Sequence, residues 1–127
     1  MAMNFSINIL VVDDSTTSRR FMCGILESIG FQNMLEAEDG LFALKILSKN
    51  KIDLIISDWQ MPRMDGMKLL KTIRSSEAYM NIPFLMVTAK TLTKNIKEAK
   101  EAGVSDYIFK PFSIDRISMT IENIFNK

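Results

Sequence analysis

A chain of 127 residues, 47% of them hydrophobic, is long enough to bury one core, so we expect a single domain over residues 1–127. Its 16 basic and 15 acidic residues leave a net charge of +1, which gives no bulk attraction to nucleic acid or to an anionic membrane. Histidine is absent, which excludes nucleophile–histidine pairs and disfavours zinc, and the single Cys23 cannot form an internal disulfide. No long apolar N-terminal segment is present, so we expect a cytoplasmic protein without membrane insertion.

Five short segments rich in branched and aromatic residues are predicted to be β-strands. They cover residues 7–12, 33–38, 52–57, 83–88 and 106–110. Three of them are almost continuously apolar, which is typical of strands covered on both faces. Because helical patterns separate the strands, the sequence predicts right-handed crossovers and a doubly wound α/β fold around a parallel sheet.

Helical periodicity fills the intervals between the strands. Two apolar stripes have helical spacing, and they are Met22, Ile25, Leu26 and Ile29, then Ile114, Ile117, Ile121 and Ile124. A narrower stripe of Leu92, Ile96 and Ala99 stands among lysines and glutamates, so we expect that helix to be the most exposed. Gly30 and Gly103 are predicted to end helices.

Polar residues stand where the predicted strands end. They are Asp13, Asp14, Asp58, Thr88 and Lys110. Each has an ordinary alternative: an aspartate before Ser15 is typical of a helix N-cap, Asp58 of a turn, Thr88 of a core hydroxyl and Lys110 of a loop. The carboxyl ends of parallel strands meet at one edge of a sheet, so we expect all five residues to face one crevice.

Three carboxylates in one crevice repel each other unless a cation joins them. With no histidine in the chain, the expected ion is a hard one that prefers oxygen, and Mg²⁺ is the favoured candidate. Magnesium is commonly held by carboxylates together with phosphate oxygens, which makes a phosphate the expected substrate. An aspartate can attack phosphorus to form an acyl phosphate while a lysine and a metal balance the charge, and Asp58 is our candidate nucleophile.

Four motifs in the sequence resemble a known family. VVDDS (11–15), SDWQMPRMDG (57–66), VTAK (87–90) and DYIFKPF (106–112) are similar to the receiver domain of two-component response regulators, and the similarity covers essentially the whole chain. The resemblance implies a flavodoxin-like (βα)5 fold with strand order 2-1-3-4-5. It also implies that Asp58 is the phospho-acceptor, served by a sensor histidine kinase.

The resemblance assigns roles to the other site residues. Asp13, Asp14, Asp58 and the backbone carbonyl of Gln60 would hold Mg²⁺, for which Mn²⁺ is a possible substitute. Lys110 would pair with the phosphoryl oxygens, and its bond to Pro111 would be cis. The remaining roles are those of Thr88 as switch hydroxyl, Tyr107 as its aromatic partner, and Gln60 and Lys90 as side chains that tune the acyl phosphate lifetime. Catalysis would be limited to autophosphorylation from a phosphodonor and autodephosphorylation.

The motifs are most similar to those of the stand-alone chemotaxis regulators. EAEDG (36–40), LMVTA (85–89) and Trp59 beside the acceptor carry this likeness. It implies a downstream target such as the flagellar motor switch, and possible control by a phosphatase. A receiver in a phosphorelay or another pathway, or a degenerate receiver that acts only as an interaction module, is the alternative.

Two other classes share part of the pattern. A flavin-binding flavodoxin-like module needs a phosphate loop after the first strand, where Asp13 and Asp14 would repel the phosphate. A haloacid-dehalogenase-type phosphatase would need two acids separated by one residue on that strand, and a cap region. Neither pattern fits residues 11–15 as well as a receiver does.

Overall fold

The computed structural model describes residues 3–89 and 93–126. Within those ranges a parallel sheet has the strand order β2-β1-β3-β4-β5. Its strands are β1 (Asn8–Val12), β2 (Asn33–Ala37), β3 (Leu54–Asp58), β4 (Phe84–Thr88) and β5 (Asp106–Phe109). The predicted doubly wound fold and its strand order are therefore confirmed.

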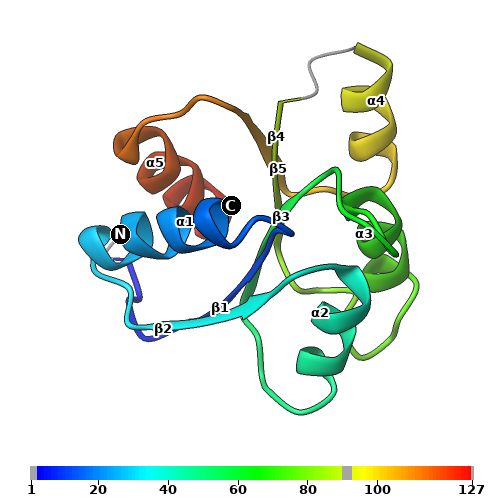
Figure 1. The fold of residues 1–127 in the computed structure, drawn as a ribbon, viewed down its shortest axis with the longest axis horizontal. Helices are drawn as coiled ribbons and strands as arrows, with labels where there is room; N and C mark the ends of the chain where they lie inside the picture. Colours follow the sequence, from blue (N-terminus) through cyan, green and yellow to red (C-terminus); the bar gives the residue numbers. More distant parts are fainter. Residues whose placement is uncertain (1–2, 90–92, 127) are drawn as a thin grey trace.

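Helices cover both faces of this sheet. They are α1 (Thr16–Ile29), α2 (Gly40–Leu47), α3 (Gly66–Arg74), α4 (Thr93–Glu101) and α5 (Ile114–Phe125). Helices α1 and α5 lie on one side, and α2, α3 and α4 lie on the other (Figure 1). None of the helices among the described residues is both long and apolar enough to cross a membrane.

Side-chain alternation in the strands divides the interior into two cores. In β1, Ile9 and Val11 point into the core beneath α1 and α5, whereas Leu10 and Val12 point into the core beneath α2, α3 and α4. All four side chains are at most 2% exposed. A strand buried on both faces needs apolar residues at every position, which explains the continuous apolar runs of the sequence.

Strand and helix ends differ slightly from the prediction. Strand β3 begins at Leu54, two residues later than predicted, and Asp53 just before it bonds twice to Asn8: its carboxylate accepts the Asn8 N–H and its own N–H donates to the Asn8 carbonyl, both at 2.8 Å. Helix α1 ends at Gly30, with φ of 131°, as predicted. Ala99 is the only buried residue among the described part of α4, which agrees with the expected exposure of that helix.

Arg74 at the end of α3 ties together loops at the amino edge of the sheet. Its Nε donates to the Gly103 carbonyl at 2.8 Å, and its Nη1 donates to the carbonyls of Met80 and Ile82 at 3.1 and 2.7 Å. The loop before β4 and the turn before β5 therefore share one side-chain donor.

Candidate active site

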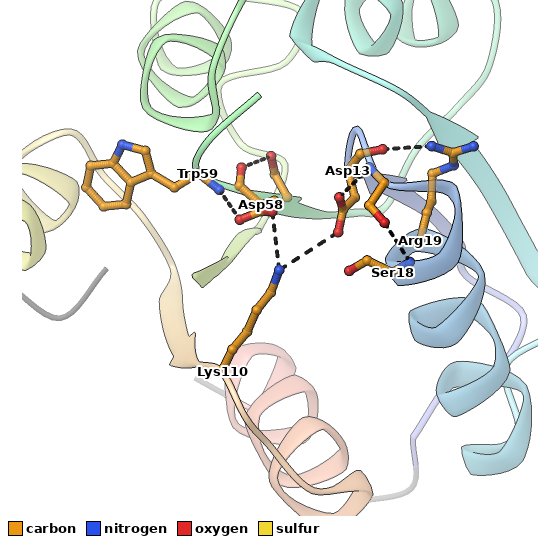
Figure 2. A network of polar contacts seen from close by, with 8 residues as sticks. Asp13, Ser18, Arg19, Asp58, Trp59 and Lys110 are labelled. Carbon is orange, nitrogen blue, oxygen red and sulfur yellow. Dashed lines mark hydrogen bonds and ion pairs between the residues drawn. The ribbon is translucent and has the colours of Figure 1, made fainter. Parts of the chain in front are cut away.

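Four of the predicted residues meet at the carboxyl edge of the sheet, and they are Asp13, Asp14, Asp58 and Lys110. Figure 2 shows three of them, Asp13, Asp58 and Lys110. Asp13 follows β1, Asp58 is the last residue of β3, and Lys110 follows β5. The Lys110 Nζ lies 3.2 Å from Asp58 Oδ2 and 4.0 Å from Asp13 Oδ2. The lysine thus reaches across the neighbouring strand to the acids, and it is not the free loop lysine that the sequence alone left open.

The acidic residues form one compact cluster. One carboxylate oxygen from each of Asp13, Asp14 and Asp58 lies within 4.8 Å of the others. Asp13 is only 7% exposed, whereas Asp14 is open to solvent. Three negative groups at this spacing, with oxygen as the only donor atom, fit a hard divalent cation better than a soft one.

Local hydrogen bonds hold Asp13 in place. Its Oδ1 accepts the Ser15 N–H at 2.9 Å, and its own N–H donates to the Ala37 carbonyl at 3.0 Å. The cap of α1 is Ser15, whose side chain accepts the Ser18 N–H at 3.1 Å. The interpretation of these acids as helix caps is therefore wrong, and the second carboxylate oxygen of Asp13, Oδ2, faces Lys110.

Asp58 is held by the main chain that follows it. Its Oδ1 accepts the Trp59 N–H at 2.7 Å, while Oδ2 faces Lys110. Burial raises the pKa of the Asp58 carboxyl, and although Lys110 and the Trp59 N–H act in the opposite direction, the net shift is upward, with Asp13 adding to it. A carboxylate that is partly desolvated is a more basic nucleophile than one in water.

The other predicted residues have varied positions. Thr88 ends β4 and is buried, and its carbonyl accepts the Lys110 N–H at 3.0 Å. Tyr107 is half-buried on β5, where Lys100 Nζ lies 5.6 Å from the ring centroid. The side chain of Gln60 is exposed. The Lys110–Pro111 bond is cis, as the resemblance implies, and Lys90 lies outside the described residues.

Sequence reasoning missed Arg19. Its Nη1 donates to the Asp13 carbonyl at 2.7 Å, and its Nε pairs with Glu36 on β2 at 2.8 Å. The side chain is only 13% exposed, so this arginine joins α1, β2 and the loop that carries the acids. A basic residue in the first turns of a helix that follows two aspartates was the available signal, but β2 contributes a partner that no local pattern indicates.

Comparison with known proteins agrees with this site. The family described as the response regulator receiver domain matches residues 9–122. The chain belongs to this receiver family. It is 42% identical over 125 residues to the chemotaxis protein CheY-3 of Vibrio cholerae, which covers 98% of this chain and 96% of that protein. It is 41% identical over 121 residues to the chemotaxis protein CheY of Pseudomonas aeruginosa, which covers 95% and 98%.

Solved structures give the same assignment. The Vibrio cholerae chemotaxis protein CheY4 superposes on the receiver with a TM-score of 0.87 at 32% identity, over 94% of this chain and 98% of that one. The receiver is therefore a component of two-component signalling. Its acidic cluster stands where receivers bind a divalent cation, and the donor set described above is consistent with that use.

Proposed function

We propose that the receiver is a phosphorylation-activated response regulator whose phospho-acceptor is Asp58. The observation that carries the proposal is the meeting of three carboxylates and one lysine around the end of β3. In the reaction, an Asp58 carboxylate oxygen bonds to phosphorus as the P–N bond to the imidazole of a kinase phosphohistidine breaks, and the leaving imidazole takes up a proton.

The residues around Asp58 would bind the cation, balance the charge of the phosphoryl group and orient the carboxylate. Asp13, Asp14, Asp58 and the Gln60 carbonyl would hold Mg²⁺, which when bound supplies positive charge against the oxygens of the transferred group. Lys110 already lies 3.2 Å from Asp58 Oδ2 and would balance charge on the opposite side. The Trp59 N–H fixes the orientation of the carboxylate, so one of its oxygens is presented to the donor.

The signal would leave the site through Thr88 and Tyr107. Phosphorylation adds about 1.5 to 2 negative charges and three acceptor oxygens. The Thr88 hydroxyl would move toward the new oxygens, and Tyr107 would move inward from its contact with Lys100. The surface of α4, β5 and α5 would then change shape and be read by a target.

The target we propose belongs to chemotaxis. Relatives that cover nearly the whole chain are named chemotaxis proteins in both Vibrio cholerae and Pseudomonas aeruginosa. A flagellar motor switch is therefore the proposed reader of the phosphorylated form, with a histidine kinase upstream.

Fluorescence of Trp59 tests the chemistry directly. Trp59 is the only tryptophan, is 5% exposed, and donates its N–H to Asp58. We would titrate the wild-type protein and Asp58→Asn with Mg²⁺ and then with beryllofluoride, a mimic of the phosphoryl group. Mg²⁺ should change the emission of both proteins, more weakly in the variant, and beryllofluoride only that of the wild type. A wild-type protein that responds to neither ligand would make the cluster structural and favour an interaction module.

A further inference from the structure

The loop between β3 and α3, residues 59–65, determines how the Asp58 carboxylate is held. Its first residue, Trp59, donates its N–H to Asp58 Oδ1 at 2.7 Å. The loop closes at its other end, where the Gly66 N–H donates to the Trp59 carbonyl at 2.8 Å. The orientation of the carboxylate therefore depends on the position of the whole loop.

Arg63 fastens this loop to α2. Its Nε donates to Asp39 Oδ2 at 2.6 Å, its Nη2 contacts the same oxygen, and Nη2 also lies 3.3 Å from Glu38 Oε1. The Asp39 side chain is only 2% exposed, and its Oδ1 accepts the Phe42 N–H at 2.9 Å, which caps α2. Both oxygens of a buried carboxylate are thus engaged, so Asp39 is a rigid anchor for the guanidinium.

The loop contains one residue with a strained backbone, and it packs closely against the start of α2. Arg63 has a φ of 63°, in the left-handed region that side chains with a Cβ rarely adopt. Beside it, the Met64 carbonyl accepts the Gly40 N–H at 3.1 Å, and a Cβ on Gly40 would lie 2.6 Å from the Met64 side chain. Strained backbone persists where its surroundings over-determine it, and such positions cluster at functional sites.

We propose that the Arg63–Asp39 pair is a clamp that positions the Asp58 carboxylate and thereby raises the affinity of the acidic cluster for its cation. The inference rests on the proposed function. With the clamp closed, the carboxylate is preorganised; with the clamp open, cation binding must also order the loop, which weakens it. Arg63 acts through the loop, so it is a positioning residue.

Simple electrostatics makes the opposite prediction for one of the two partners. By long-range charge alone, removing the positive charge of Arg63 should strengthen cation binding by the acidic cluster, and removing the negative charge of Asp39 should weaken it. Loss of the clamp weakens binding in both cases. The signs of the two changes therefore separate positioning from long-range charge.

The test is Mg²⁺ titration calorimetry on the unphosphorylated protein for wild type, Arg63→Gly, Asp39→Asn and the double variant. Glycine tolerates a φ of 63°, so Arg63→Gly removes the clamp without imposing new strain. Each single change should raise the Mg²⁺ dissociation constant about 3- to 10-fold, and the double variant should be no weaker than the weaker single one. Melting temperatures show whether each variant is folded at the temperature of the titration.

Lys71→Gln is the matched control. It removes the 2.9 Å Lys71–Glu98 ion pair between α3 and α4, and Lys71 and Arg63 side chains are both 55% exposed. Its Mg²⁺ affinity should equal that of the wild type. Changes of opposite sign in the two single variants, or additive losses in the double variant, would overturn the clamp. If the wild type binds Mg²⁺ and takes a phosphoryl group while every variant binds equally well, only the clamp fails; if the wild type binds no Mg²⁺, the proposed function fails and the clamp with it.

Discussion

Replacing Gly66, the first residue of α3, with alanine should disturb the active site. A Cβ at this position would lie 2.2 Å from the Asp58 carbonyl oxygen, about 1.2 Å inside the closest ordinary contact of 3.4 Å, and 3.0 Å from the Trp59 Cα. These atoms belong to the backbone, so they cannot turn aside as a flexible side chain would. The end of β3 and the start of α3 must therefore separate, and Asp58 must move with them.

The size of the effect follows from this overlap. Overpacking a buried site costs about 1 to 3 kcal/mol, and an overlap with backbone belongs at the upper end of that range. For a domain of this size we expect a fall in melting temperature of about 10 °C. A shift of about 1 Å in a reacting group can cost about 100-fold in rate, so phosphorylation by a small donor should slow by one to two orders of magnitude.

Gly24→Ala provides the control for the glycine-to-alanine change itself. Gly24 is exposed in the middle of α1, and a Cβ built there would meet no heavy atom within 4 Å beyond its chain neighbours and the backbone of its own helix. Alanine stabilises a helix interior by about 1 kcal/mol relative to glycine, so this variant should melt a few degrees higher and phosphorylate normally. The two variants would be compared by thermal unfolding and by donor-driven phosphorylation. A Gly66→Ala protein that melts and reacts like the wild type would refute this account of the loop.

Three further outcomes are expected. Asp58→Asn should melt at a higher temperature than the wild type at pH 7, because the pKa of Asp58 is raised in the folded protein and its charged carboxylate therefore opposes folding. The difference in melting temperature should vanish as pH falls through the folded pKa toward the unfolded value near 3.9, which thermal unfolding at several pH values would show. Burial raises the pKa of Cys23 to about 11, so at pH 8 its thiol should react with a disulfide reagent at least about 100-fold more slowly than a free thiol, until denaturant exposes it. Thr88→Ala should still accept a phosphoryl group but leave Tyr107 beside Lys100, and NMR signals of the Tyr107 ring that shift as in the wild type would contradict the switch.

Sequence reasoning located the site because its signals are local. Each of Asp13, Asp58 and Lys110 stands at the end of a recognisable strand, and the parallel sheet brings those ends together. The apolar stripe of α1 likewise predicted the buried face of that helix correctly, because Met22, Ile25 and Leu26 are all buried. Periodicity and the order of elements along the chain are therefore sufficient to predict the strand ends that form the site and the buried face of α1.

Other features depend on contacts that no local pattern reveals. Helices α2 and α3 were expected only from the alternation of strands and helices, and their bounds come from the structure. Arg63 and Asp39 lie 24 positions apart, and their pairing requires the loop to pack on the start of α2. The Trp59 N–H that orients Asp58 is a main-chain group, which is present at nearly every residue and so carries no sequence signal.

The hydrogen bonds of Arg74 make the amino edge of the sheet, where β4 and β5 begin, more constrained than the carboxyl edge, where the acids lie. One guanidinium supplies donors to three loop carbonyls at the amino edge, so the entrances to β4 and β5 are bound to each other and to the end of α3. The carboxyl ends of the same two strands carry Thr88 and Lys110. Because Arg74 holds the amino ends of β4 and β5, we expect any displacement that follows the proposed movement of Thr88 to be largest at the carboxyl ends of these two strands and smallest at their amino ends.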